Sequence, residues 1–517
     1  MPPALHTLAF VQPNQYKDSV ALMRVAQGLL ALPDVVNATL QLGNPANKEI
    51  LRDAGLLTPE VADAGPSDIM VVVQARTAEA AEGARDEART QLAGQTAMVS
   101  PGAATEVPAS TLAMGLARQT QANLAQISVP GPYAAAEALK AVQLGLNVFL
   151  FSDNVPLAQE VALKLEAERR GVLVMGPDCG TAIVGGVPLG FANNVRRGGI
   201  GLVAASGTGL QEVTTQIHRM GGGISHAIGT GGRDVQAAVG AITMRQGIAL
   251  LARDAGTRVI VVICKPPAPE VAAVVMAALR DAGKPSVVLF IGAAKTSSPL
   301  NKTAAPIRVV HTLVDCAAAA LRLAGQRPRA INRYALPTRP RFARSQKYLR
   351  ALYSGGTFAA EAQALWATQG LKVWSNVPLD DALDLPNPSK SSREHTALDL
   401  GDDAFTVGRP HPMIDQTSRV QRLLQEAADP ATRVILLDVV IGWGAHADPA
   451  AELALALTQA QQIAKRGGRR LGLVGFVCGT DLDPQGLARQ EATLRDAGMA
   501  LAGNSANAAW LAGQWLK

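Results

Sequence analysis

The chain has 517 residues, of which 48% are hydrophobic, 17% charged and only 4% aromatic. This apolar content excludes a largely disordered chain, and the few charges and aromatic rings argue against a coiled coil or a base-stacking nucleic-acid platform. The formal net charge of +6 is a mild excess without a long basic arm, so small anionic molecules are expected ligands and nucleic acid is not. Four scattered cysteines, no signal peptide and no long apolar span predict a cytoplasmic protein without membrane contact.

The first 95 residues alternate extended and helical patterns, which predicts a small ferredoxin-like or ACT-like α+β domain over 1–95. Residues 96–120 lose this periodicity and are predicted to be a linker. The expected strands lie at 5–11, 35–42 and 68–74, and the expected helices at 19–32, 47–54 and 77–92.

From residue 121 onward, buried apolar strands alternate with helices, as in parallel sheets that are covered on both faces. One long helix is expected over 235–253. This pattern predicts an α/β protein with a Rossmann-like domain and two flavodoxin-like domains. Their expected ranges are 121–195, 196–324 and 348–517, with a basic, proline-rich linker at 325–347.

The last of these domains repeats features of the one before it. A Ser–Gly turn stands between a strand and a helix at 206–209 and again at 354–357. A TRVI strand follows in each domain, at 257–260 and at 432–435. Because these features recur in the same order, the sequence predicts a duplication.

The two Ser–Gly turns, called elbows below, are the first candidate site. Each would leave free backbone N–H groups at a helix N-terminus, where the helix dipole favours an anion. One such turn could be an ordinary capped connection, but two matched turns suggest a phosphate or carboxylate held between two helix ends. The residues are Ser206, Gly207, Thr208, Gly209, Ser354, Gly355, Gly356 and Thr357.

Three further segments carry polar residues where strands end. Asp178 and Thr181 would face a ligand at the carboxyl edge of a sheet, and Cys179 is expected to be a buried thiol. Arg233 is either an anion clamp or half of a surface pair with Asp234.

The loop 401–415 compresses Arg409, His411 and Asp415 into a frame fixed by two prolines, which favours a functional role for His411. Asp438, inside an apolar strand, is interpreted either as a hydrogen-bonded structural carboxylate or as a functional group.

Several of these motifs together resemble the FdrA family along nearly the whole chain. They include MGPDCGTAIVGG, SHAIGTGGRDV, ICKPP, SGGTFAAEA and ILLDVVIGWGAHADPA. More distantly, the middle region resembles the α chain of succinyl-CoA synthetase and the C-terminal region its β-chain ligase domain. The resemblance implies a CoA-binding-like domain at 121–195 and two ligase-like domains after it.

The chain departs from the synthetases in one loop. There, the strand matching 284–292 leads to a Gly-His-Ala-Gly loop whose histidine is phosphorylated, whereas the loop 293–303 here has no histidine. This departure argues against a phosphohistidine relay. The turn 128–134 has one glycine where a dinucleotide turn has three, which argues against CoA binding.

The resemblance implies a transferase: a subunit of the oxamate carbamoyltransferase complex of purine (allantoin) degradation, with two further subunits. Its substrates would be carbamoyl phosphate and oxamate or oxalurate. The elbows would then hold the phosphate, Arg233 or Arg409 would clamp its oxygens, and His411 would shuttle a proton. No cofactor is required by this interpretation, although Mg²⁺ could accompany the phosphate. The alternatives are an acid–CoA ligase and a non-catalytic regulatory or scaffold subunit.

Overall fold

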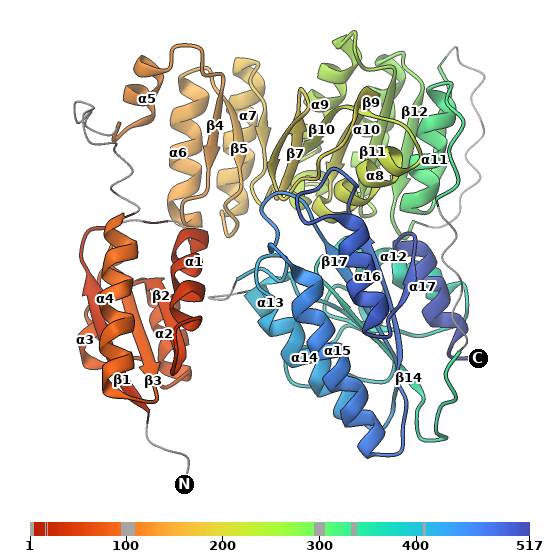
Figure 1. Cartoon of the computed structure of the whole chain (residues 1–517). Helices are drawn as coiled ribbons and strands as arrows, with labels where there is room; N and C mark the ends of the chain where they lie inside the picture. The colour runs from red at the N-terminus through yellow and green to blue at the C-terminus, as the bar shows by residue number, and fades with distance from the viewer. Residues whose placement is uncertain are drawn as a thin grey trace. The chain divides into compact units, whose positions relative to one another are not determined.

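The computed structural model describes residues 5–15, 17, 19–94, 109–293, 305–331, 339–406 and 410–517. It contains two compact units, one of residues 1–115 with 406–410 and the other of residues 116–405 with 411–517 (Figure 1). Parallel sheets with flanking helices and a small N-terminal α+β domain confirm the predicted fold class.

The N-terminal unit is built on a three-stranded antiparallel sheet in the order β1-β3-β2. The central strand β3 is apolar throughout, and its alternate residues pack on opposite faces of the sheet. Val71 and Val73 join a cluster with α1 and α4, whereas Met70 and Val72 join one with α2 and α3. The elements are β1 (His6–Gln12), α1 (Ser19–Leu30), β2 (Val35–Leu42), α2 (Pro45–Asp53), α3 (Pro59–Ala62), β3 (Ile69–Ala75) and α4 (Ala78–Gly94).

The second unit begins with a small parallel sheet in the order β4-β5-β6. A short helix, α5, lies in the stretch that the sequence predicts as a linker. The elements are α5 (Leu112–Arg118), β4 (Leu124–Ile127), α6 (Gly131–Gln143), β5 (Asn147–Leu150), α7 (Leu157–Arg170) and β6 (Val174–Met175).

A seven-stranded sheet follows, in the order β13-β12-β11-β9-β10-β7-β8. Its first five strands are parallel, and the hairpin β7–β8 adds an antiparallel edge to β10. The elements are β7 (Thr181–Val184), β8 (Val187–Gly190), β9 (Arg197–Ala205), α8 (Gly207–Arg219), β10 (Ile224–Gly229), η1 (Gly232–Val235), α9 (Ile242–Arg253), β11 (Val259–Cys264), α10 (Pro269–Asp281), β12 (Ser286–Phe290), β13 (Ile307–Val310) and α11 (Leu313–Leu323).

The last sheet is wholly parallel, in the order β15-β16-β14-β17-β18-β19. Its elements are β14 (Tyr348–Tyr353), α12 (Gly356–Ala367), β15 (Trp374–Ser375), η2 (Asp381–Leu383), β16 (Thr396–Asp399), α13 (Asp403–Thr406), α14 (Thr417–Ala428), β17 (Thr432–Val440), α15 (Pro449–Arg466), β18 (Gly472–Cys478), α16 (Leu487–Asp496), β19 (Ala500–Ala502) and α17 (Ser505–Gln514).

The two larger sheets share one topology. When the hairpin β7–β8 and the short edge strand β15 are left aside, five parallel strands remain in each sheet. Counted from the strand that leads into the elbow, their order is 2-1-3-4-5, namely β10-β9-β11-β12-β13 and β16-β14-β17-β18-β19. Ser206 and Ser354 both follow the first strand of this order. The two elbows thus occupy equivalent places in the two sheets, as the predicted duplication requires, and the duplication itself stays a prediction.

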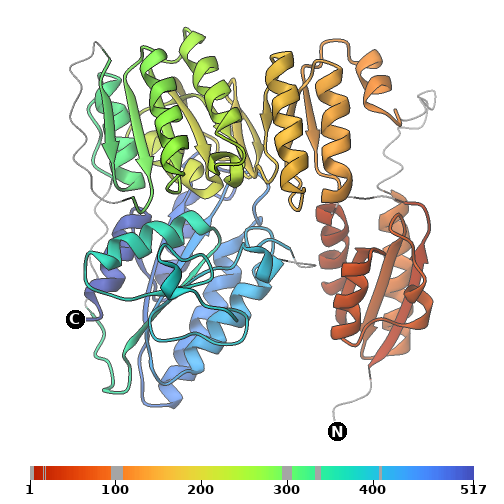
Figure 2. The same ribbon diagram turned by 180° about the vertical axis from the view of Figure 1, so that it is seen from behind.

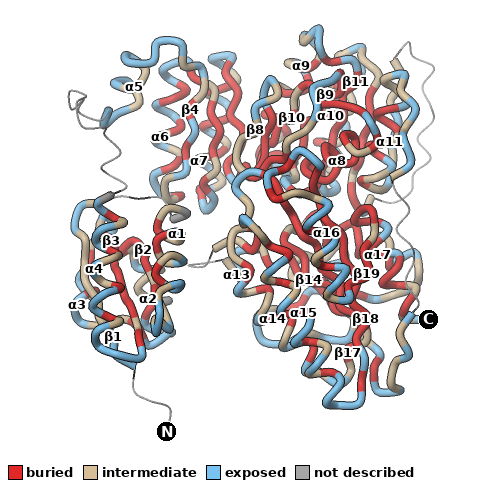
Figure 3. The backbone as a smooth tube through the Cα atoms, viewed as in Figure 1, coloured by how far each residue is buried: buried red, intermediate tan, exposed pale blue. Residues whose placement is uncertain are grey.

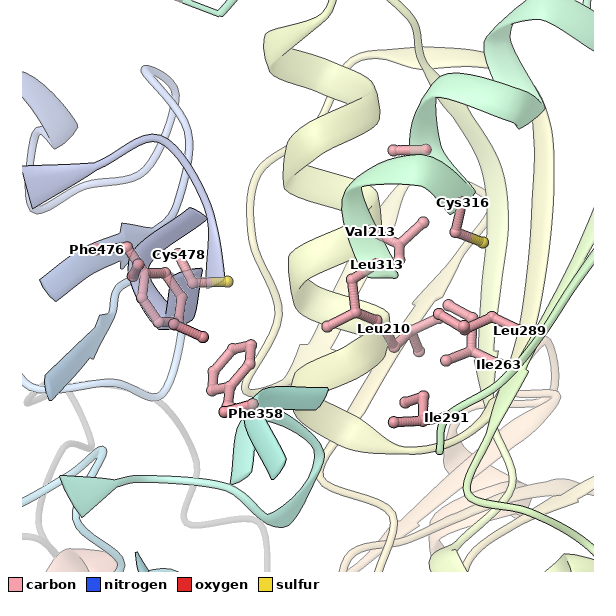
Figure 4. Close-up of a cluster of buried hydrophobic side chains, with 14 of the residues drawn as sticks. Leu210, Val213, Ile263, Leu289, Ile291, Leu313, Cys316, Phe358, Phe476 and Cys478 are labelled. Atoms are coloured by element: carbon pink, nitrogen blue, oxygen red, sulfur yellow. The ribbon is translucent and has the colours of Figure 1, made fainter. Parts of the chain in front are cut away.

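The two larger domains pack through their inner helices. Helices α9 and α10 cover the outer face of the first large sheet and α14, α15 and α16 that of the second, while α8, α11, α12 and α17 lie between the sheets (Figures 1 and 2). One hydrophobic cluster spans this interior, with Leu210 and Leu313 on one side and Phe358 and Phe476 on the other (Figure 4). The rings of Phe358 and Phe476 meet edge to face at 5.1 Å. Burial accordingly follows the strands and the inner helices (Figure 3).

The long helix expected over 235–253 is broken. Helix α9 begins only at Ile242, because Gly240 and Ala241 have left-handed backbones with φ of 70° and 57°. The Asp234 carboxylate accepts the N–H groups of Thr243 and Met244 at 3.2 and 2.9 Å, and thereby caps α9 from the preceding turn. Within the described ranges, no helix combines the length and apolarity needed to cross a membrane.

Candidate functional site

The two elbows meet at the carboxyl edges of the two large sheets. Ser206 is the N-cap of α8, and its Oγ accepts the N–H of Gly209 at 3.0 Å. The same oxygen lies 2.5 Å from Thr357 Oγ1 in the first turn of α12, and the two hydroxyl groups share a hydrogen bond. The structure therefore brings the two predicted helix ends together.

Each helix end packs a threonine against a glycine of the other. A Cβ at Gly355, the N-cap of α12, would lie 2.3 Å from Thr208 Cγ2. A Cβ at Gly209 would lie 3.0 Å from Thr357 Cγ2. Gly355 thus has to be glycine because no side chain fits between the helix ends.

This contact places two positive helix ends side by side. Neither α8 nor α12 has an acidic residue in its first turn. In the described part of the chain, no acceptor contacts the N–H groups of Gly207, Thr208, Gly356 and Thr357. Because like ends of helix dipoles repel, an anion beside them would be stabilised by both helices.

Two charged side chains that the sequence analysis missed border α12. Asp399, the last residue of β16, has Oδ2 2.8 Å from the position that a Cβ of Gly356 would take. Lys265, directly after β11, has Nζ 3.5 Å from the same position. The sequence offers a signal for each residue, because each stands where a buried apolar strand ends. The two strands, however, lie in different sheets. Burial raises the pKa of Asp399 to about 7.

His411 lies beside this group with one ring nitrogen occupied. Its Nδ1 accepts the Met413 N–H at 3.2 Å, and its ring contacts that of Phe191 at 5.5 Å. Nε2 lies 2.5 Å from the position that a Cβ of Gly401 would take. Burial, with the charge of Arg419, lowers the pKa of His411 to about 4, so the ring is neutral at pH 7 and carries its proton on Nε2.

Ser354 differs from the expectation that it binds a ligand. Its N–H donates to Asp438 Oδ1 at 2.9 Å, and its hydroxyl group donates to Asp438 Oδ2. Arg419 Nη2 in turn donates to the backbone oxygen of Asp438 at 2.6 Å. All three residues are buried, so Asp438 is the hydrogen-bonded structural carboxylate of the two interpretations, and Ser354 anchors the elbow from inside.

Asp178 and Arg233 lie among the acidic residues Asp153, Glu160 and Asp403. The Asp178 side chain reaches solvent, but the protein crowds it, and this desolvation together with Asp153 raises the pKa of Asp178 to about 7. Arg233 Nη2 pairs with Glu160 Oε2 at 2.9 Å and donates to Val155 O at 2.7 Å. The guanidinium group is thus largely engaged within the protein.

The remaining predicted residues have structural contacts or lie outside the described residues. Thr181 is close to the start of α8, but its hydroxyl group donates to Phe191 O at 2.9 Å. Asp415 accepts the Thr417 N–H at 2.7 Å at the start of α14. Arg409 lies outside the described residues. Cys179 is buried, as expected, and this burial raises the pKa of its thiol to about 12.

The turn 128–134 lacks the open space beside its backbone that a dinucleotide-binding turn gives to a phosphate group. A Cβ at Gly131, the first residue of α6, would lie 2.4 Å from Asp153 O and 2.7 Å from Asn154 O. The backbone of the next loop therefore lies against this helix start. Gly207 is open by comparison, since only Thr181 Oγ1, at 3.6 Å, comes near a Cβ placed there.

Three family models match the chain. A model described as CoA-ligase matches residues 352–515, a model described as CoA binding domain matches 196–292, and one described as AllF, heavy metal-associated domain, matches 5–108. The CoA-binding match falls on the first large sheet and not on 121–195. Residues 5–108 include no cysteine, and no described group of three or more His, Cys, Asp or Glu side chains could hold a metal. The donors there do not fit a thiophilic metal ion.

Similar proteins extend these matches. The chain is 40% identical over 513 residues to the Uncharacterized protein YahF of Escherichia coli (strain K12), which covers 98% of both chains. It is 29% identical over 119 residues to the ADP-forming succinate–CoA ligase subunit alpha 2 of Archaeoglobus fulgidus, covering 22% of this chain and 42% of that subunit. The dinucleotide forming acetyl-coenzyme A synthetase 1 of Ca. Korarchaeum cryptofilum (apo form) is 15% identical, over 76% of this chain and 82% of that chain, with a TM-score of 0.31 that supports no conclusion.

These findings overturn the expected carbamoyltransferase. The models that match the two large domains describe a CoA ligase and a CoA-binding domain, and short stretches match succinate–CoA ligase subunits. The acid–CoA ligase alternative agrees better with these matches, and CoA binding, which the sequence analysis argued against, is again plausible. The finer resemblance to the FdrA family stays a prediction. The chain belongs to the family of Escherichia coli YahF, a succinyl-CoA synthetase-like family with CoA-ligase and CoA-binding domains.

Proposed function

We propose that the chain takes part in acid–CoA ligation and holds the phosphate of an acyl phosphate between the N-termini of α8 and α12. The substrates would be a small carboxylic acid, in its acyl phosphate form, and CoA. The single observation that carries the proposal is the contact between the two helix ends, whose free N–H groups and dipoles favour one shared anion.

The side chains around the elbows suit this role. Lys265 adds a positive charge beside Gly356, and neutral His411 carries an Nε2–H donor next to Gly401. These groups would stabilise negative charge on phosphate oxygens as phosphate leaves an acyl group. CoA, when bound, would supply the thiol that accepts the acyl group. Open space at Gly207 and Gly232 offers two backbone positions that a phosphate group could approach.

The missing histidine decides in which form the phosphate arrives. The loop 293–303 contains no histidine, so the proposal includes no phosphohistidine relay through this loop. An acyl phosphate, or inorganic phosphate in the reverse direction, needs no carrier because it can reach the elbows from solution. The role of partner subunits stays a prediction.

The test is Gly207→Ala, which places a methyl group where the phosphate would approach α8. Its only near neighbour would be Thr181 Oγ1 at 3.6 Å, so folding should be retained. Losing one helix end should cost about 1–2 kcal/mol, which is about 5- to 30-fold in affinity. Calorimetric titration with inorganic phosphate measures this loss, and thioester absorbance with acetyl phosphate and CoA measures turnover.

Gly83→Ala in α4 is the matched control, because a Cβ there meets nothing within 4 Å and lies in the N-terminal unit. It should bind phosphate as the wild type does. Equal affinity in Gly207→Ala and the wild type would contradict the proposed site. Gly355→Ala is unsuitable as a binding test, because its clash with Thr208 would change the interface itself.

A further inference from the structure

Asp399 presents one free oxygen to the start of α12. The residue is only 8% exposed, and its Oδ1 accepts the Gly401 N–H at 2.9 Å. Oδ2 has no hydrogen-bond partner among the described residues and lies 2.8 Å from where a Cβ of Gly356 would stand. A largely buried carboxyl group thus points an oxygen that no described residue bonds at the place where two helix ends favour an anion.

The charges around Asp399 are mixed and leave it unpaired in the described part of the chain. Lys265 approaches the same point beside Gly356 from the other large sheet but forms no ion pair with Asp399. Tyr353 on β14 lies opposite Asp399 on β16 in the strand register. The further ionisable groups on neighbouring elements are Asp402 on the next turn, Asp438 on β17, Arg419 on α14 and His411.

A bound dianion and an ionised Asp399 would be in conflict. Two negative groups in contact repel strongly in a largely buried site, whereas a neutral carboxylic acid can donate a hydrogen bond to an anion. We propose that Asp399 takes up a proton when a tetrahedral dianion binds between the N-termini of α8 and α12, and then donates a hydrogen bond from Oδ2 to it. The inference rests on the proposed function and assigns the ligand class, a phosphate or acyl phosphate group.

The ionisation of Asp399 supports this geometry. Burial raises its pKa to about 7, with the Gly401 N–H and Lys265 opposing that rise and Asp402 adding to it. Protonation at neutral pH therefore costs little free energy. A bound dianion is a further negative neighbour and moves the pKa upward, so binding draws a proton from solvent. The affinity should then fall as the pH rises above about 7.

Sulfate is the probe, because it is a tetrahedral dianion that does not itself titrate between about pH 6 and 9, so that any pH dependence belongs to the protein. Calorimetric titration of the full chain should show sulfate affinity falling by up to about tenfold per pH unit above about pH 7. Repeating the titration at pH 7.5 in buffers of different ionisation enthalpy should show up to one proton taken up per sulfate bound.

Asp399→Asn removes the charge and keeps the shape, so it should bind sulfate with a nearly flat pH profile and no proton uptake. Asp178→Asn is the matched control, because desolvation and the charge of Asp153 also raise the pKa of Asp178 to about 7, and it should keep the wild-type profile. A wild-type affinity that does not depend on pH, or a slope retained by Asp399→Asn, would overturn the inference and leave the elbow site standing. A wild-type chain that binds neither sulfate nor phosphate would overturn the proposed function and the inference with it.

Discussion

His411 is a histidine that the fold keeps uncharged. Its Nδ1 accepts a backbone N–H, its ring contacts Phe191, and burial lowers its pKa to about 4. A ring in this state can donate from Nε2 but takes up a proton only in acid. The proton shuttle expected from the sequence therefore stays a prediction, and the geometry favours a fixed hydrogen-bond donor.

The neutral ring predicts a specific loss of stability in acid. The unfolded chain protonates His411 near pH 6.5 and the folded chain only near pH 4, so the unfolded state binds more protons between these values and stability falls as the pH is lowered through them. His411→Phe keeps an aromatic ring without this proton. Between pH 7 and pH 4.5, the free energy of unfolding of the wild type should therefore fall by about 2 kcal/mol more than that of the variant.

Urea unfolding of both proteins at the two pH values measures this difference. Parallel changes in wild type and His411→Phe would show that the ring titrates normally, and would restore the proton-shuttle interpretation.

At the scale of elements, the contact between α8 and α12 depends on a glycine that faces a threonine. Gly355 has an extended backbone that any residue can adopt, so only the space next to Thr208 requires glycine there. A methyl group at this position would overlap with both γ atoms of Thr208. The two elbows are thus not interchangeable, since the N-cap is serine in α8 and must be glycine in α12.

A double-mutant cycle tests this contact. Gly355→Ala alone should cost about 1–3 kcal/mol of stability through overpacking. In a Thr208→Ala background the same change should cost clearly less, because both γ atoms are gone and only Cβ remains near. Chemical unfolding of the four proteins gives the coupling energy, and additive effects would mean that the helix ends are not in contact.

At the scale of the whole molecule, each large domain caps a helix of the other. Glu212 on α8 accepts the N–H of Ser505, the first residue of α17, at 3.2 Å. Glu361 on α12 accepts the N–H of Leu313, the first residue of α11, at 2.7 Å. The Ser505 hydroxyl group also donates to Glu361 at 2.5 Å. With one hydrophobic cluster across the interior, neither domain completes its packing alone.

This exchange predicts that the two large domains unfold together. All five tryptophans lie in the last domain, whereas Cys264 and Cys316 are buried in the one before it. Loss of tryptophan fluorescence in urea should therefore coincide with pulsed labelling of those two thiols. Cys478, in the last domain, is the internal control. Separate midpoints for the two reporters would contradict the shared core.

The sequence predicts the class, the duplication and the elbows because these depend on local signals. A Ser–Gly turn after an apolar strand marks a helix start, and the same order of signals marks the same place in each sheet. The break before Ile242 was missed because Asp234 caps α9 across seven intervening residues. The β7–β8 hairpin had a signal in its Gly185–Gly186 turn, which a glycine-rich stretch obscured.

The proximity of Lys265 and Asp399 to Gly356 could not be predicted from the sequence, because it exists only once the two domains pack against each other. The same holds for Ser354, whose inward bond to Asp438 depends on the register of β14 against β17. Long-range pairs of this kind carry no local pattern.

The reciprocal caps give the two large domains the character of a twofold dimer joined into one chain. In a dimer of identical subunits, any residue on one side of the axis must also stand on the other. Here Lys265 directly follows β11 of one domain, and Asp399 is the last residue of β16 of the other. The two domains are not identical, and both of these charged side chains border Gly356 on α12, so the two helix ends have different surroundings. An anion bound at the start of α12 would therefore meet a cation from one domain and an acid from the other.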